Sequence, residues 1–175
     1  MPAVRMIKPK DRRMIETSGD ICSFMAIGEE TDNTYALMES IISPGGGPPP
    51  HIQHRNEEGF LIVEGEIVFT LDGKELPVAV VGDFVNVPKG VVHTFKNKTD
   101  KPARILVVMS PSVEEYYLLE VGHPITDINA PLPPTTPADV EKYLTVCAKY
   151  GIEYVFTEDQ KFYEGGTSVA QTGTD

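Results

Sequence analysis

Hydrophobic and polar positions alternate in short runs between Ile21 and Ser110, and clusters of Gly, Pro, Asn and Asp separate the runs. Runs rich in Val, Ile, Phe and Tyr with such boundaries are typical of consecutive β-strands. The eight predicted strands are ICSFMAI, TYALMESIIS, GFLIVEG, EIVFTLDG, LPVAVVGD, FVNVP, VVHTFKN and ARILVVMS. An antiparallel sheet of this size hides its edges best by folding on itself. We therefore predict an all-β barrel or jelly roll made of two antiparallel sheets.

The periodicity changes to a helical one after Pro111. Ser112 and Glu115 have the spacing of a capping box ahead of an apolar run, which predicts a short helix. A proline-rich stretch follows, and Pro137 then suits the first position of a second helix capped by Thr136. We expect short C-terminal helices packed after the barrel.

These patterns divide the chain of 175 residues into four parts around one core. We predict an N-terminal arm over residues 1–20, the barrel over 21–110, and a helical extension over 111–163. Residues 164–175 have almost nothing to bury, so we predict a disordered tail there.

Charge and composition exclude several classes of partner. The formal net charge of −11 would repel nucleic acid and anionic membrane surfaces. No apolar stretch reaches the length of a membrane-spanning helix. Cys22 and Cys147 stand far apart, and no secretion signal opens the sequence. We expect a soluble, cytoplasmic protein with no nucleic-acid or membrane partner.

Two short stretches carry candidate chemistry. In "PGGGPPPHIQHRNEEGFLIVEGE", His51 and residue 53 would point to the same side of a strand, and Glu58 could join them. In "GDFVNVPKGVVHTFKN", His93 lies within an otherwise apolar strand. Two histidines and a carboxylate are usual ligands of divalent Fe, Ni, Mn, Cu or Zn, and they leave positions open for substrate. Alone, His93 would more often be an ordinary core histidine.

These two stretches resemble the two motifs of the cupin superfamily. Gly45, His51, Glu58 and Gly65 fit the first motif at its fixed spacing. The second motif is met without a gap by Gly82, Pro88, Gly90, His93 and Asn97. The resemblance implies a cupin jelly-roll barrel with a mononuclear metal site.

One position departs from the cupin pattern. The first motif has a second histidine two places after His51, where this sequence has Gln53, and an extra histidine stands at His54. In a regular strand Gln53 occupies the ligand position and His54 points away, although a bulge would reverse this. We prefer Gln53, whose amide oxygen binds a transition metal more weakly than imidazole does.

"GPPPH", "EEGFLIVEGE" and the C-terminal "AKYGIEYV" are similar to single-domain bacterial cupins related to quercetin 2,3-dioxygenase. This resemblance implies an oxygen-dependent dioxygenase acting on a small aromatic or enol substrate. It implies metal ligation by His51, Glu58 and His93, with Gln53 or His54 completing the set, and Glu58 could serve instead as catalytic base. It also implies a homodimer, and the apolar outer face of strand 66–71 would need covering.

Two other functions fit the same residues. The first is a non-oxidative isomerase, epimerase or cyclase, which the missing imidazole favours slightly. The second is a small-molecule-binding cupin whose metal site is degenerate. Metal analysis separates the binding protein from the enzymes, and oxygen uptake separates the dioxygenase from the isomerase.

Overall fold

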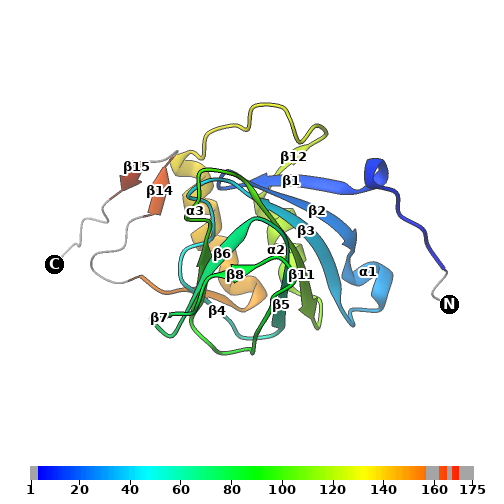
Figure 1. The fold of residues 1–175 in the computed structure, drawn as a ribbon. Coiled ribbons are helices and arrows are strands. Elements are labelled where there is room, and N and C mark those ends of the chain that lie inside the picture. The colour runs from blue at the N-terminus through cyan, green and yellow to red at the C-terminus, as the bar shows by residue number, and fades with distance from the viewer. Residues whose placement is uncertain (1–3, 157–161, 165–166, 170–175) are drawn as a thin grey trace.

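The computed structural model describes residues 4–156, 162–164 and 167–169. Two antiparallel sheets face each other and enclose the core, which confirms the predicted jelly-roll class (Figure 1). The larger sheet has the order β12-β1-β2-β3-β11-β5-β9. In that order its strands are His123–Ile125, Arg13–Thr17, Asp20–Ala26, Ala36–Ile42, Ala103–Ser110, Glu57–Glu64 and Phe84–Val87.

The smaller sheet has the order β13-β4-β10-β6-β7, and the short strand β8 also pairs with β6. These strands are Ile152–Tyr154, His51–Gln53, His93–Lys96, Glu66–Leu71 and Lys74–Glu75, with β8 at Ala79–Val80. A separate pair, β14 (Phe162–Glu164) and β15 (Thr167–Val169), lies on the side of the molecule opposite α1 (Figure 1).

All eight strands predicted from the hydrophobic pattern occur, with shifts of a few residues at their ends. The short strand β4 was assumed when His51 and residue 53 were placed on one face, whereas the short strands β1, β7, β12 and β13 were not expected. Residues 13–17, which we assigned to an arm outside the barrel, form β1 and pair with β2 along their whole length. In the tail predicted over 164–175, Glu164 and residues 167–169 belong to the β14–β15 pair. Residues 165–166 and 170–175 of that tail lie outside the described residues.

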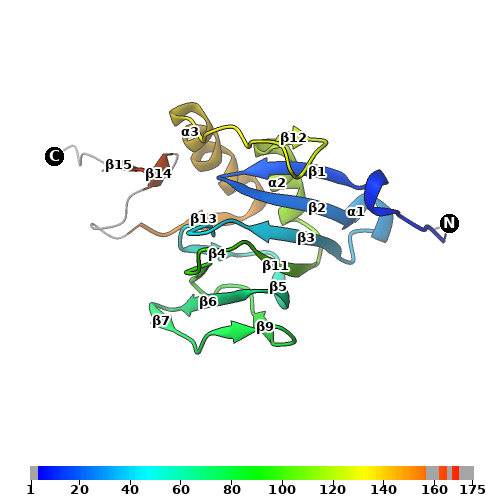
Figure 2. The same cartoon turned by 45° about the horizontal axis from the view of Figure 1, so that its top comes forward.

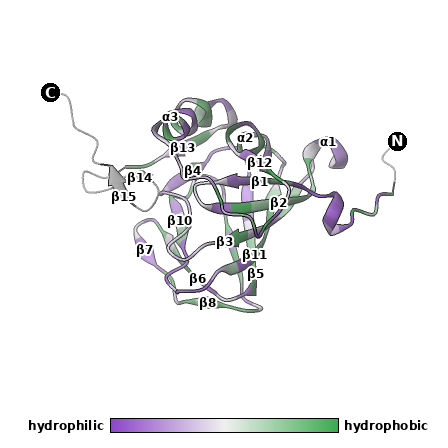
Figure 3. Cartoon of the chain, turned by 90° about the horizontal axis from the view of Figure 1, so that it is seen from above, coloured by the Kyte–Doolittle hydropathy of each residue, from purple (hydrophilic) through white to green (hydrophobic). Residues whose placement is uncertain are grey.

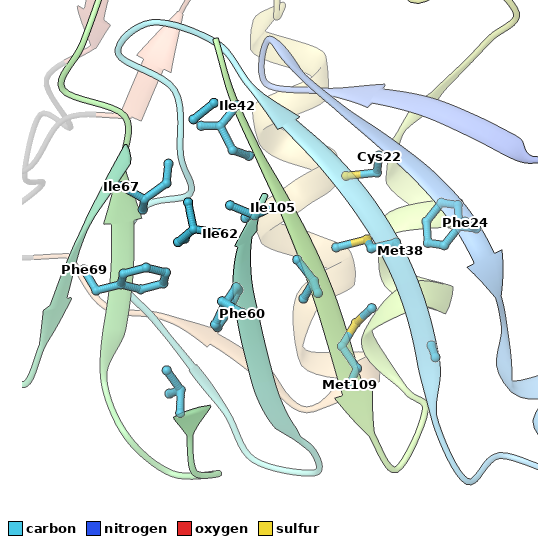
Figure 4. Close-up of a cluster of buried hydrophobic side chains, with 14 of the residues drawn as sticks. Cys22, Phe24, Met38, Ile42, Phe60, Ile62, Ile67, Phe69, Ile105 and Met109 are labelled. Atoms are coloured by element: carbon cyan, nitrogen blue, oxygen red, sulfur yellow. The ribbon is translucent and has the colours of Figure 1, made fainter. Parts of the chain in front are cut away.

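The core fills the space between the sheets with aliphatic and aromatic side chains. Phe60 and Ile62 of β5 point toward Ile67 and Phe69 of β6 (Figure 4), and all four are 2% exposed or less. Hydrophobic and hydrophilic residues both occur along the strands (Figure 3), as expected where one face packs inward and the other faces water. Burial of these side chains is the main stabilising contribution to the barrel.

Helices lie beside the larger sheet at its β1 side, away from β7 and β9 (Figure 2). They are α1 (Gly28–Thr31), α2 (Glu114–Val121) and α3 (Pro137–Val146), with the 3₁₀ turns η1 (Pro9–Asp11) and η2 (Cys147–Tyr150). None of the helices in the described part of the chain has the length and apolar character needed to cross a bilayer. The helices instead pack on the barrel and close one side of its interior.

The two helix starts differ in how well the sequence predicted them. Thr136 caps α3 as expected, since its side chain accepts a hydrogen bond from Asp139 N. The capping box predicted for α2 is wrong, because Val113 is the residue before that helix. The Ser112 hydroxyl instead donates to the Asn33 side chain, and Glu115 accepts from the backbone N–H of Gly28. Tertiary contacts therefore replace the local cap.

Candidate metal centre and cavity

The glycine- and proline-rich segment before β4 is hydrogen-bonded to the barrel, and β4 then begins at His51. The Asp20 carboxylate accepts hydrogen bonds from the backbone N–H of Ser43 and Gly47, both at 2.9 Å. Gly47 has φ of +123°, and a Cβ there would lie 2.0 Å from the carbonyl oxygen of Phe95. Only glycine tolerates this backbone conformation so close to a neighbouring strand. The sequence GGGPPP therefore fixes the entry into β4.

His51 and His93 lie directly opposite each other on the paired strands β4 and β10. Their ring centroids are 4.2 Å apart, and the residues are 5% and 1% exposed. The Nδ1 of His51 lies 2.9 Å from the carbonyl oxygen of Pro49, and that of His93 lies 3.1 Å from the carbonyl oxygen of Val91. Because a carbonyl oxygen only accepts, each Nδ1 carries the proton and donates. Each Nε2 is left with a lone pair in the neutral ring.

Glu58 reaches the same place from β5 in the opposite sheet. Its Oε2 lies 2.8 Å from the Nε2 of His93, and the potential ligand atoms of His51, Glu58 and His93 all lie within 4.8 Å of one another. Burial raises the pKa of Glu58 to about 7 and lowers the pKa of His51 to about 3. Burial also lowers the pKa of His93. Without a cation, the proton between Glu58 and His93 therefore belongs to the carboxyl group.

Gln53 and His54 point in opposite directions, as the strand period requires. Gln53 lies two residues after His51 on the same strand face, and it is 2% exposed. Within the described part of the chain, neither its amide oxygen nor its amide nitrogen has a hydrogen-bond partner. The His54 side chain is 49% exposed and lies 2.8 Å from the Glu153 carboxylate on the outside of the barrel. His54 is not part of the buried cluster.

Glu114, which the sequence did not single out, adds a second carboxyl group to this region. It opens α2, is 8% exposed, and lines the same cavity as Glu58. Burial and the neighbouring Glu58 charge raise the pKa of Glu114 well above its ordinary value. No spacing rule distinguishes Glu114 from its neighbour Glu115, because only the packing of α2 on the barrel decides which of them faces the interior.

A cavity of about 100 Å³ lies beside the cluster, between the barrel and the C-terminal segment. His51, Glu58 and Glu114 line it together with Tyr117 and Tyr154, whose hydroxyl groups are 2.9 Å apart. The rest of the lining is largely apolar and includes Ile42, Phe60, Phe95, Val107 and Ile152. A ligand held there would be shielded from water beside the buried imidazoles.

The residues of the cluster fit a divalent metal ion. Imidazole nitrogens and a carboxylate are the donor set that Fe, Ni, Mn, Cu and Zn accept. The backbone carbonyl groups that fix each Nδ1 proton are the usual outer partners of metal-bound histidine. Gln53 adds a buried amide oxygen with no other partner. Such an unpaired buried group is costly unless something binds it.

Comparison with known proteins agrees with this geometry. Residues 38–109 match the cupin domain family. A protein of Bacillus subtilis (strain 168) named quercetin 2,3-dioxygenase is 25% identical over 143 residues, which are 81% of this chain and 41% of that protein. A Mycobacterium tuberculosis protein (strain ATCC 25618 / H37Rv) named β-D-galactosidase is 34% identical over 76 residues, which are 43% of this chain and 64% of that protein. The chain spans less than two thirds of either relative.

The structure also resembles solved structures of other proteins. One, described as a predicted oxalate decarboxylase from Thermotoga maritima, superposes with a TM-score of 0.57 at 18% identity, over 61% of this chain and 99% of that one. At this identity the likeness shows the fold. The relatives carry different names, so the reaction has to be argued from the residues of this chain.

Proposed function

We propose, from the premise that this chain is a member of the cupin superfamily, that it is a metal-dependent enzyme acting on a small molecule in the barrel cavity. One observation supports this most strongly. The buried side chains of His51, Glu58 and His93, from three different strands, lie close together beside a cavity. These three residues leave coordination positions open, as catalytic rather than structural sites do, and Gln53 would take one of those positions. We place Gln53 in the proposed ligand set and leave His54 out of it.

The proposed chemistry depends on the polar groups and the apolar walls of the cavity. A bound divalent ion would act as a Lewis acid that stabilises negative charge on a substrate oxygen. His51 and His93 hold their Nε2 lone pairs toward one point through their Nδ1 hydrogen bonds. Glu58 either completes this donor set or accepts a proton from the substrate, since its pKa is raised to about 7. The apolar walls exclude water and strengthen each of these interactions.

The reaction we favour is oxygen-dependent cleavage of a small aromatic or enol compound. Support for it comes from the relative named quercetin 2,3-dioxygenase, whose similarity covers 81% of this chain. The test is metal analysis of the purified protein followed by oxygen-electrode measurements with catechol and with a flavonol. We expect oxygen uptake that depends on added metal and is abolished in Glu58→Gln. A metal-loaded protein that consumes no oxygen with either compound would contradict a dioxygenase.

Gln53 supports a second candidate, a non-oxidative isomerase, epimerase or cyclase. A neutral amide oxygen is a weaker partner for a redox metal than imidazole, but it does not impair a metal that only polarises a carbonyl group. The oxygen measurement separates the two candidates, because this reaction consumes none. A purified protein without metal that takes up none from solution would instead indicate a binding protein.

We also propose a homodimer, on the strength of one apolar surface. Val63, Val80 and Phe84 come from the strands β5, β8 and β9, Val81 follows β8 directly, and each of the four is 42% exposed or more. Exposed apolar patches of this kind are commonly covered by another chain. Light scattering during gel filtration tests this, and a monomer mass for the full chain would contradict it.

A further inference from the structure

Glu114 presents a buried oxygen atom to the cavity that nothing else in the described structure uses. The residue is 8% exposed and belongs to the cavity wall, and its Oε2 has no hydrogen-bond partner. A buried polar atom without a partner destabilises a protein by about 1–3 kcal/mol. A ligand group that hydrogen-bonds to this oxygen would remove that cost. Binding at Oε2 would therefore be favourable.

Several other polar groups around the cavity already have partners, while the Nε2 of His51 keeps its lone pair. The Tyr117 and Tyr154 hydroxyls bond to each other. The Asp20 carboxylate, also in the cavity wall, accepts two backbone N–H groups. Glu58 is paired with His93. Among the described residues that line the cavity, Glu114 is therefore the one with a buried, unpaired oxygen that a ligand could bind.

The wall also lacks a group that would recognise an anion. No lysine or arginine belongs to the described residues that line the cavity, and Asp20, Glu58 and Glu114 do belong to it. A carboxylate or phosphate placed there would be removed from water without a cationic side chain to pair with it, which is costly. Without a bound metal ion, the lining thus disfavours acids and favours an uncharged molecule that carries hydroxyl groups.

Size restricts the ligand further. The cavity has a volume of about 100 Å³, whereas a cavity of about 150 Å³ holds benzene. A larger hollow of about 630 Å³ adjoins it and shares Ser18, Gly47 and Pro49 with it. The inner cavity is therefore smaller than one that encloses a whole ring, so a one-ring ligand would extend toward the outer hollow.

We propose that Glu114 is a substrate-binding residue, whose free carboxyl oxygen holds a hydroxyl group of a small uncharged ligand beside His51 and Glu58. This deepens the proposed function and rests on it, since it names the substrate class of the same cavity: a hydroxylated compound of about one ring. The residue comes from α2, outside the region that matches the cupin family. Substrate choice would then depend on the C-terminal segment.

The test compares phenol with fluorobenzene, two probes of nearly equal shape of which only phenol can donate a hydrogen bond. Binding is measured by NMR titration of the full chain after removal of metal with a chelator. We expect phenol to bind about tenfold more tightly than fluorobenzene, as one buried hydrogen bond allows. Benzoate should bind at least about tenfold more weakly than phenol, because its charge has no partner.

Two variants of Glu114 and one control locate the effect. In Glu114→Leu the preference for phenol should fall to about one, while Glu114→Gln should keep part of it, since an amide oxygen also accepts. Glu115→Gln is the matched control, because Glu115 is adjacent and fully buried but bonds to Gly28 outside the cavity wall. It should retain the full preference. Because the probes are read without metal, a missing metal centre and a missing hydroxyl site give different results.

Several outcomes would overturn this proposal. They are the absence of saturable phenol binding, equal binding of phenol and fluorobenzene by the unaltered chain, and benzoate binding as tight as that of phenol. An unchanged preference in Glu114→Leu, or an equal loss in Glu115→Gln, would also show that the hydroxyl group is held elsewhere.

Discussion

The barrel interior has two ends formed by the same strands. One end is an apolar core, and the other is the polar candidate site. Along β5 the inward-facing residues run from Glu58 through Phe60 to Ile62, all at most 4% exposed. Along β10 they run from His93 to Phe95. Each strand therefore passes from a polar end to an apolar end within one continuous element. The side-chain chemistry alone separates core from site.

The two ends differ in whether their side chains have all the packing or hydrogen-bond partners that they need. At the apolar end, Phe69 packs against Phe60 and Phe95 with ring centroids 5.3 and 5.7 Å away. At the polar end, Gln53 and Glu114 retain buried atoms without partners. Close packing stabilises the fold, while unpaired polar groups oppose it and persist where a ligand uses them. Phe60, 6.5 Å from His93 between ring centroids, marks the boundary.

Removing an aromatic ring from the apolar end should have the largest effect on folding. Phe69→Ala empties a fully buried position, so we expect the free energy of unfolding to fall by about 3–5 kcal/mol. Urea denaturation followed by circular dichroism measures it. Val4→Ala is the control, because Val4 is fully exposed and lies outside the surface proposed to bind a second chain, and it should change stability by less than about 0.5 kcal/mol. A similar loss in both variants would mean that this end is not the main stabilising core.

At the polar end, the larger effect should fall on metal binding. His93→Gln removes one of the proposed imidazole donors, and we expect zinc affinity to drop by more than about a hundredfold, since even outer-shell changes cost tenfold to a hundredfold. Stability of the metal-free protein should fall less than in Phe69→Ala. Calorimetric zinc titration gives the affinity. His54→Gln is the matched control and should bind zinc normally, because His54 lies on the outer surface. Equal losses in both would contradict the proposed ligand set.

Zinc affinity should also fall as the pH is lowered, because burial raises the pKa of Glu58. Its carboxyl group must lose a proton to join the ligands, and its pKa is raised to about 7. Below that pH the proton competes with the metal, so affinity should fall about tenfold for each pH unit; above it the curve should flatten. Titrations from pH 5.5 to 8.5 test the slope. Glu58→Gln has no proton to lose there, so its weaker binding should be nearly independent of pH over this part of the range.

The apolar end could be predicted from the sequence more fully than the polar end. Alternation of side chains identified the strands that carry Phe60, Phe69 and Ile105, because burial of one face is a local property of each strand. The same period correctly separated inward-facing Gln53 from outward-facing His54. The short strands β1 and β13 escaped prediction, since pairing with a distant neighbour, not their own pattern, makes them strands.

The contribution of the C-terminal segment to the polar end could not be predicted. Glu114 and Glu115 have the same side chain and adjacent positions, and the local capping rule selected Glu115 for a role that it does not have. Which of the two faces the cavity depends on how α2 packs against the barrel. Such packing is a property of the assembled layers, and it carries no signature in either strand or helix period. The motif residues were found because their spacing along the chain resembles that of the two cupin motifs.

The smallest effect in this series would come from Gln53→His, which restores a second imidazole on the inward face of β4. We expect zinc affinity to rise by about tenfold, because imidazole is a better partner for transition metals than an amide oxygen and the new side chain starts from the same strand position. Zinc titration of the variant measures the gain, and His54→Gln in the same background should leave it intact. A loss of affinity would show that the amide fits this site better than imidazole does. No change at all would place Gln53 outside the ligand set, and its unpaired amide would then be available to the substrate instead.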